Sequence, residues 1–395
     1  MIELIATTSF GLEAVVAREL RRLGYERQTT EDGRVRFTAD EAAICRANLH
    51  LRSAERVLLK LGEFEARDFG ELFDQTVALP WAEWLPADAA FPVRGRSVKS
   101  QLASVPNCQS IVKKAIAESL TRSHRRVWFE ETGPEFAVEV SILKDRVTLS
   151  IDTSGRGLHK RGYRKLVGPS PLRETLAAAL VQLSYWNAGR PLIDPFCGSG
   201  TIAIEAALLG RDMAPGLGRS FAAERWPRIA DTLWTEVRSE ARDSIQDRPL
   251  SIIGTDSDAD VLRLARHHAR EAGVEDAIHF QQQPLAEFTT KRPYGCIICN
   301  PPYGERSGDR NSAEAIYREM ARVFAPLETW SIYVITSHPE FERLFARRAD
   351  RRRKLYNGRM ECTYYQFYGP RPPLRINEKI TSAFGGANSL SPGRG

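Results

Sequence analysis

Four consecutive residues after a predicted strand have the groups needed to hold an exocyclic amine. Strand 295–299 is followed by Asn300, Pro301, Pro302 and Tyr303. The two prolines fix the backbone and remove two N–H donors, which leaves carbonyl oxygens such as that of Pro301 as acceptors. The Asn300 amide adds an acceptor and donors, and the Tyr303 ring can stack on a flipped base. A strand-ending turn is the simpler interpretation, but the set favours in-line methyl transfer from a sulfonium to a nucleobase amine, which needs alignment and acceptors.

A glycine-containing loop upstream suits the cofactor of such a transfer. Strand 190–193 continues into Asp194 and a loop with Gly198 and Gly200, and a helix follows. Glycines let backbone N–H groups approach a ligand, and the helix N-terminus favours a carboxylate. Asp256 ends the next strand, where an acid can bind a ribose diol. The loop lacks the third glycine of the dinucleotide fingerprint and the Gly-Lys of a P-loop. We therefore expect a nucleoside-bearing cofactor of another class rather than a plain turn.

The elements that position these motifs alternate along the second half of the chain. The predicted order is helix 171–186, strand 190–193, helix 200–209, strand 250–255, helix 258–272, strand 277–282, strand 295–299, helix 312–324 and strand 329–336. This alternation predicts an α/β domain with a mostly parallel, doubly wound sheet. Two strands around Asn357-Gly358, within 353–368, predict a C-terminal antiparallel hairpin. The first 151 residues mix strands and helices in an α+β pattern, with a helix at 68–79 and a hairpin of 137–143 and 147–151.

Together the motifs resemble a known family. DPFCGSGTIAIEAA (194–207) with NPPYGER (300–306) is similar to the class I S-adenosylmethionine-dependent N-methyltransferases. Further stretches extend the resemblance over about residues 1–372 to the THUMP-domain RNA methyltransferases of the RlmL/YpsC type, bacterial 23S rRNA guanine-N2-methyltransferases. These stretches are 97–116, 151–164, 171–181, 213–226 and 355–369.

The resemblance implies a domain order and a cofactor. It implies a ferredoxin-like segment at 1–45, a THUMP RNA-binding domain at 46–154 and a Rossmann-like class I methyltransferase domain at 155–372. We expect residues 373–395, rich in Gly, Ser and Asn, to be a disordered tail. The implied cofactor is S-adenosyl-L-methionine.

The resemblance also assigns site residues. Asn300, Pro301, Pro302 and Tyr303 would form the catalytic site and hold the target guanine. The expected cofactor-binding residues are Asp194, Phe196, Cys197, Gly198, Gly200, Thr201, Asp256, Ser257, Gln283 and Asn300. Relatives often have an Asp that meets the adenine amine where this chain has Pro284, which has no side-chain acceptor. We expect Gln283 or a backbone carbonyl to substitute.

Local clusters of cations predict where RNA binds. The net charge of +6 is modest, but residues 347–354 contain six cations. Such a cluster can contact phosphates, although a solvated surface explains it as well. The predicted RNA-binding residues are Lys113, Lys114, His159, Lys160, Arg161, Tyr163, Arg164, Arg351, Arg352 and Arg353.

Cysteine usage and hydropathy exclude several classes of protein. The six cysteines are scattered, which indicates reduced thiols in a cytoplasmic protein. Cys296 and Cys299 form a C-x-x-C, but the apolar sequence around them is typical of a buried strand. No metal is therefore expected. The chain has no apolar run of about 18 residues and no signal peptide, so no membrane association is expected. The oligomeric state stays open, with a monomer slightly favoured.

Two alternatives to an rRNA methyltransferase stay open. The chain can be a tRNA guanine-N2 methyltransferase, because THUMP-type modules also serve tRNA enzymes. It can also be a non-catalytic RNA-binding assembly factor with a methyltransferase-like fold, which only Pro284 favours. A DNA adenine methyltransferase is a weaker option, since the N-terminal region has no evident target-recognition repeat for duplex DNA.

Overall fold

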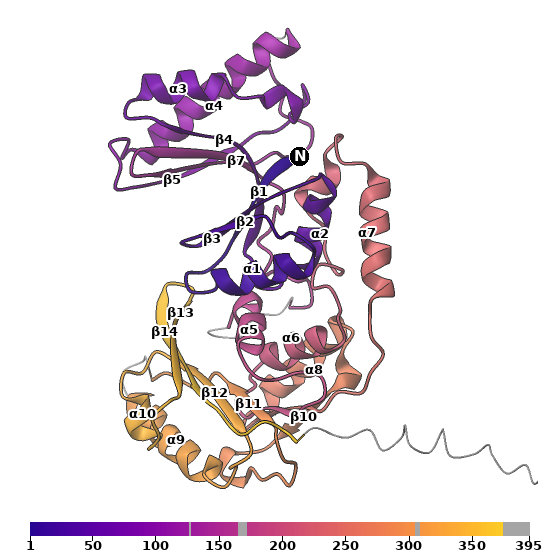
Figure 1. The fold of residues 1–395 in the computed structure, drawn as a ribbon, viewed down its shortest axis with the longest axis vertical. Helices are drawn as coiled ribbons and strands as arrows, with labels where there is room; N and C mark the ends of the chain where they lie inside the picture. Colours follow the sequence, from indigo (N-terminus) through magenta and orange to yellow (C-terminus); the bar gives the residue numbers. More distant parts are fainter. Residues whose placement is uncertain (126–127, 165–171, 305–308, 374–395) are drawn as a thin grey trace, which may run out of the picture.

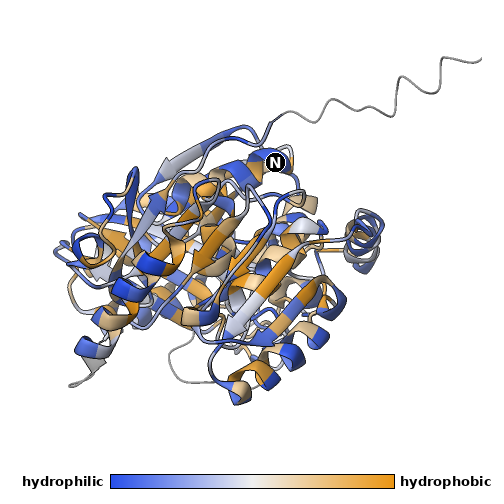
Figure 2. Ribbon diagram, turned by 90° about the horizontal axis from the view of Figure 1, so that it is seen from below, coloured by the Kyte–Doolittle hydropathy of each residue, from blue (hydrophilic) through white to orange (hydrophobic). Residues whose placement is uncertain are grey.

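The computed structural model describes residues 1–125, 128–164, 172–304 and 309–373. The predicted tail from residue 374 onward lies outside these residues. The chain forms two seven-stranded sheets, one from the N-terminal region and one from the C-terminal region (Figure 1). Hydrophobic residues are frequent in the central strands, and hydrophobic and hydrophilic residues alternate along the helices (Figure 2).

The N-terminal sheet joins two smaller units through one shared strand. Its order is β2-β3-β1-β4-β7-β6-β5, and only the β5–β6 pair is parallel. Leu58 of β4 pairs with Ile5 on one side and with Asp152 on the other, so β4 belongs to both units. The elements are β1 (Ile2–Thr7), α1 (Glu13–Arg22), β2 (Gln28–Glu31), β3 (Arg34–Ala39), α2 (Ala42–His50), β4 (Arg56–Glu65), α3 (Phe69–Val77), β5 (Val93–Val98), α4 (Val105–His124), β6 (Val138–Leu143) and β7 (Arg146–Asp152).

The C-terminal sheet has the predicted mixed architecture. Its order is β10-β9-β8-β11-β12-β14-β13, parallel from β10 to β12 and antiparallel in the last two strands. The elements are α5 (Glu174–Gln182), β8 (Leu192–Asp194), α6 (Thr201–Gly210), α7 (Asp231–Asp243), β9 (Ile252–Asp256), α8 (Ala259–Glu271), β10 (Ile278–Gln282), β11 (Cys296–Cys299), α9 (Asp309–Phe324), β12 (Ser331–Thr336), α10 (Phe341–Leu344), β13 (Arg351–Asn357) and β14 (Met360–Phe367). Strands β8, β9 and β11 are neighbours, so their carboxyl ends meet at one edge.

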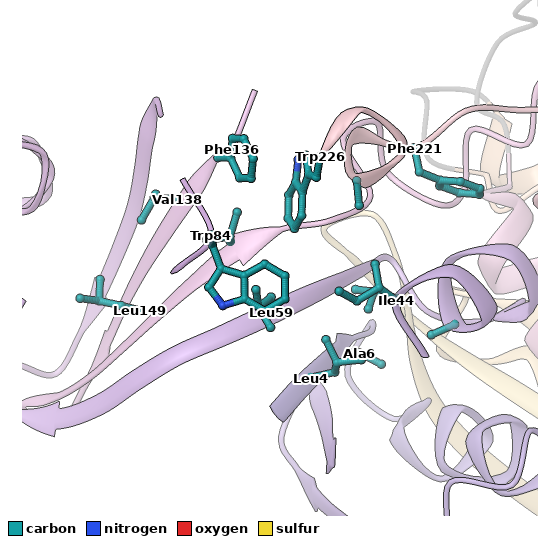
Figure 3. Packing of buried hydrophobic residues seen from close by; sticks show 14 of the residues in the cluster. Leu4, Ala6, Ile44, Leu59, Trp84, Phe136, Val138, Leu149, Phe221 and Trp226 are labelled. Carbon is teal, nitrogen blue, oxygen red and sulfur yellow. The ribbon is translucent and has the colours of Figure 1, made fainter. Parts of the chain in front are cut away.

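A segment between α6 and β9 packs on the N-terminal region instead of its own sheet. Trp226 is buried and stacks on Phe136 just before β6, with ring centroids 4.6 Å apart (Figure 3). Helix α7 follows and contacts α2, as Figure 1 also shows. Sequence patterning did not predict α7, although Trp234, Val237 and Ala241 are its buried face. This segment ties the two halves of the molecule together.

The C-x-x-C sequence is part of the core. Cys296 and Cys299 are the first and last residues of β11, whose four side chains are all fully buried. Among the residues that the structure describes, no group of three or more His, Cys, Asp or Glu side chains is arranged to hold a metal ion. In the same part of the chain, no helix is both long and apolar enough to cross a membrane.

Candidate cofactor and substrate site

The glycine loop connects β8 to α6 in a conformation that only glycine adopts easily. Gly198 has φ of +51° and Gly200 has φ of +84°, both in the left-handed region. A Cβ on Gly200 would lie 3.0 Å from Cζ of Phe280, whereas a Cβ on Gly198 would enter open space. The Cys197 N–H donates to the Thr255 carbonyl (3.0 Å), which ties the loop to β9. The loop is therefore fixed on one side and open at Gly198, which fits a ligand lying against the backbone there.

Asp256 lies beside this opening. Its carboxylate accepts the Gly198 N–H (3.0 Å) through one oxygen and the Asp258 N–H (3.1 Å) through the other. A carboxylate has about four lone-pair sites, so Asp256 can still accept hydroxyl groups of a ribose. Ser257, next in sequence, is exposed at the same edge. The arrangement fits the nucleoside part of S-adenosylmethionine.

Asp194, at the end of β8, is an acid of the site whose pKa is strongly shifted. It is 1% exposed, and its carboxyl accepts the Phe196 N–H at 3.1 Å. Burial raises the pKa of Asp194 to about 8, with a further upward contribution from the negative charge of Asp256. A bound ammonium group would counter this effect. Asp194 is thus suited to the amino group of the methionine part of the cofactor.

Sequence reasoning missed one residue that supports the loop. His268 of α8 is fully buried, and its Nδ1 lies 3.2 Å from the Ser199 carbonyl oxygen. A carbonyl only accepts, so Nδ1 carries the proton. The His268 ring also lies beside Tyr163, with centroids 6.5 Å apart. A lone histidine in a helix gives no sequence signal for this role.

Gln283 is the residue expected to take over the adenine contact that an Asp makes in relatives. Its backbone N–H donates to the Asp256 carbonyl (3.0 Å), which places Gln283 beside the carboxyl end of β9. Its side-chain amide N–H donates to the Glu287 carbonyl at 2.9 Å, which leaves its Oε1 as an acceptor. This geometry supports Gln283 as the adenine contact, whereas Pro284 begins the turn that follows.

The Asn-Pro-Pro-Tyr segment follows β11 and is held by two tyrosines. The Tyr303 hydroxyl donates to Oδ1 of Asn300 at 2.5 Å. The fully buried Tyr317 of α9 donates to the Pro302 carbonyl at 2.7 Å and contacts Thr336 at 2.9 Å. Sequence reasoning missed Tyr317, which lies in an ordinary amphipathic helix. Because Tyr317 occupies the Pro302 carbonyl, the acceptors that face a substrate are expected to be Asn300 Oδ1 and the Pro301 carbonyl.

Three side chains of the connector between the two halves are enclosed, which corrects their RNA-binding interpretation. Arg161 and Tyr163 are each 4% exposed, and both contact Oε1 of Glu205 in α6, at 3.4 and 3.0 Å. Burial raises the pKa of Glu205, while the nearby guanidinium groups of Arg161 and Arg52 act against this rise. Arg164 is similarly enclosed and lies 3.4 Å from a carboxylate oxygen of Glu174. Arg161 also donates to the Arg52 carbonyl of the N-terminal half, whereas Tyr163 and Arg164 contact Glu205 and Glu174 of the C-terminal half. None of the three side chains is available to RNA.

The other predicted RNA contacts differ in how available their charges are. His159 lies 3.2 Å from a carboxylate oxygen of Glu55, while Lys160 beside it is exposed. Lys113 pairs with Glu131 at 2.5 Å and covers the Phe91 ring. The ammonium of Lys114 lies 5.9 Å from the centroid of the Phe73 ring.

The predicted arginine cluster lies on the edge strand β13. Arg351 and Arg352 are exposed and Arg353 is half-buried. Arg352 pairs with Glu342 at 2.6 Å. Burial and the charge of Arg351 lower the pKa of Arg353. Arg351 and Arg352 are therefore the exposed cations of the three, and Glu342 compensates the charge of Arg352.

Comparisons with known proteins match every part of this architecture. Three protein families match this chain: the "RlmL ferredoxin-like domain" at residues 3–58, the "THUMP domain" at 66–152 and the "RMKL-like, methyltransferase domain" at 161–366. The chain is 49% identical over 375 residues to the Bacillus subtilis protein "Putative RNA methyltransferase YpsC", covering 94% of this chain and 97% of that protein.

Solved structures agree over nearly the whole chain. A Listeria monocytogenes protein described as "a predicted N6-adenine-specific DNA methylase" has a TM-score of 0.90 and 50% identity, covering 93% of this chain and 96% of its own. The protein SMU.472, described as "a putative methyltransferase complexed with SAH", has a TM-score of 0.90 and 45% identity, covering 94% of this chain and 99% of its own. The methyl donor is therefore S-adenosylmethionine. The chain belongs to the RNA methyltransferases of the RlmL/YpsC type, with a ferredoxin-like domain, a THUMP domain and an RMKL-like methyltransferase domain.

Proposed function

We propose that this RNA methyltransferase transfers a methyl group to the exocyclic N2 amine of a guanine in 23S rRNA. The observation that carries the proposal is the placement of Asn300, with its amide oxygen held by Tyr303, at the carboxyl edge beside the glycine loop. The proposed RNA substrate and the buried, free cysteines suit a cytoplasmic enzyme.

The chemistry follows from what the two acceptors do to the amine. S-adenosylmethionine, when bound, supplies an electrophilic methyl group on sulfur. Asn300 Oδ1 and the Pro301 carbonyl each accept one hydrogen of the guanine amine, which directs the nitrogen lone pair toward that methyl. As the N–C bond forms and the C–S bond breaks, positive charge develops on the nitrogen, and both acceptors stabilise it. The proton that the nitrogen then loses passes to water.

The tyrosines position this pair. Asn300 Oδ1 has two lone pairs, so it can keep the Tyr303 hydroxyl and still accept the amine. Tyr317 fixes the Pro302 carbonyl and thereby the turn that presents Pro301. We infer that Tyr317 is a positioning residue and that the Tyr303 ring stacks on the target base.

Replacement of Asn300 tests the proposal. We expect Asn300→Ala to lower kcat for methylation by about 100- to 1000-fold, the usual cost of losing one transition-state hydrogen bond. The measurement is transfer of labelled methyl from S-adenosylmethionine to purified 23S rRNA and, separately, to tRNA. Binding of the same RNA should change little. Methylation of tRNA alone would favour a tRNA enzyme, and wild-type activity in the variant would contradict the assigned role.

A further inference from the structure

An aromatic cavity forms where the N-terminal region meets the C-terminal hairpin. The cavity has a volume of about 310 Å³ and is lined by Ser9, Phe10, Tyr356 and Gly358. Phe10 lies in the β1–α1 loop, and Tyr356 and Gly358 belong to the β13–β14 hairpin. Figure 1 shows this hairpin, in yellow, reaching the indigo N-terminal elements. The cavity therefore depends on both halves of the molecule.

Both rings are available to a ligand. Phe10 is 49% exposed, so a large part of its ring can meet a ligand. Tyr356 is half-buried and meets Phe10 edge-on, with centroids 6.1 Å apart and an interplanar angle of 78°. A Cβ on Gly358 would touch nothing within 4 Å, so the turn leaves this side of the cavity open.

The loop that carries Phe10 is rigidly built. The Glu13 carboxylate accepts the N–H groups of Gly11 and Gly33, both at 2.9 Å. Gly11 has φ of +91°, and a Cβ there would lie 2.7 Å from the Lys354 carbonyl of the hairpin. The backbone beside the exposed ring is thus held by specific contacts, and preorganisation of this kind lowers the entropic cost of binding.

The cavity lies on the same edge of the sheet as the substrate acceptors. Asn300 follows β11, and β12 continues at that edge to Thr336, which pairs with Thr363. The hairpin extends beyond this pair to its turn. Strand spacing and rise place Tyr356 on the order of 15–20 Å from Asn300. Tyr303 packs against the same core as Leu355 and Met360 of the hairpin.

Charged side chains of both signs lie around the cavity. Lys354 lies 5.7 Å from the centroid of the Tyr356 ring but pairs with Glu361 at 2.6 Å, so its charge is largely compensated. Arg359, next to Gly358, is exposed and is the cation that can meet a phosphate. Stacking platforms flanked by cations bind single-stranded nucleic acids, because every base has a π-face and every nucleotide a phosphate. We propose that this cavity binds an unpaired base of the substrate RNA, a few nucleotides from the target guanine. The proposal rests on the RNA methyltransferase function above.

The test uses the full chain and a fluorescein-labelled single-stranded RNA of mixed sequence, about 12 nucleotides long. We expect Phe10→Ala and Tyr356→Ala to weaken its binding, measured by fluorescence anisotropy, by about 5- to 150-fold, as for loss of one stacked base. Phe10→Trp should retain binding, whereas Phe10→Leu, which keeps the apolar volume but has no ring, should not. A thermal melt of each variant checks that it is folded.

A matched control lies at the opposite edge of the catalytic sheet. Tyr185 is 50% exposed and stacks on Tyr368, which follows the far end of β14. Tyr185→Ala should bind the RNA as the wild type does. Affinities of Phe10→Ala and Tyr356→Ala within twofold of wild type would overturn the proposal, as would an equal loss in Tyr185→Ala. Loss of activity only on ribosomal particles, with naked RNA bound normally, would also overturn it and indicate a protein contact.

Two readouts separate this proposal from the proposed function. Binding of S-adenosylhomocysteine, measured by calorimetry, should be unchanged in the Phe10 and Tyr356 variants. If these variants bind RNA normally while Asn300→Ala loses methylation, only the base-binding proposal fails. If the wild-type chain methylates no RNA, the proposed function itself is wrong.

Discussion

At the proposed cofactor site, we expect the protonation state of one buried carboxyl group to control ligand binding. Asp194 is protonated over much of the acid range, because burial raises its pKa to about 8. A bound ammonium group favours the ionised form, so binding must release a proton from Asp194 below that pKa. The same shift affects stability. The contribution of Asp194 to the free energy of unfolding is complete below its unfolded pKa near 3.8. It is lost as the pH rises toward the folded pKa of about 8.

We therefore predict that affinity for S-adenosylhomocysteine rises with pH. Between about pH 5.5 and about pH 7.5 the gain should approach roughly tenfold per pH unit. Calorimetry over this range measures it, and Asp194→Asn should bind more weakly and without this dependence. An affinity of the wild type that stays flat over the range would show that Asp194 does not contact the ammonium group.

At the scale of elements, most of the catalytic sheet was predictable because local patterns determine it. Strand 295–299 matches β11 and the predicted hairpin around Asn357-Gly358 matches β13–β14. The connector was predictable only in part. The partner of Arg161, Glu205, lies 44 residues away in sequence, so composition suggested an exposed basic segment where the fold buries it. Tyr317 and His268 were missed for the same reason, since their partners belong to other elements.

The contact between α8 and the glycine loop can be tested by replacing His268. Loss of the His268–Ser199 hydrogen bond in His268→Phe should raise KM for S-adenosylmethionine about fivefold and change kcat less, because about 1 kcal/mol of loop ordering is lost. His268→Asn, whose amide N–H replaces Nδ1–H, should recover most of the affinity. His279→Phe, on the exposed face of β10, is the control. Equal effects on KM and kcat, or none, would argue against a positioning role.

At the scale of the whole molecule, two features make the halves one unit. β4 belongs to both parts of the N-terminal sheet, and the segment around Trp226 inserts the catalytic half into the N-terminal core. Arg161 adds a link, because its guanidinium contacts Glu205 of α6 and donates to the Arg52 carbonyl of the N-terminal half. The molecule thus holds the THUMP domain at a fixed position relative to the catalytic edge, which suits recognition of one site in a folded RNA.

Trp226→Ala tests this coupling. Its buried ring stacks on Phe136, so the free energy of unfolding should fall by about 3–5 kcal/mol. Hydrogen exchange should speed up both in α7 and in β6, on opposite sides of the contact. Trp128→Ala, which removes an 80% exposed ring, should change stability by about 0.5 kcal/mol or less. Faster exchange in α7 alone would mean that the halves are not coupled through Trp226.

We propose that this chain methylates guanine N2 in 23S rRNA through Asn300. The most direct measurement is a mass-spectrometric map of modified nucleosides in rRNA and tRNA from a strain that lacks the gene. We predict that one N2-methylguanosine disappears from 23S rRNA and returns with the wild-type gene but not with Asn300→Ala. Unchanged N2-methylguanosine in 23S rRNA, or its loss from tRNA instead, would show that 23S rRNA is not the substrate.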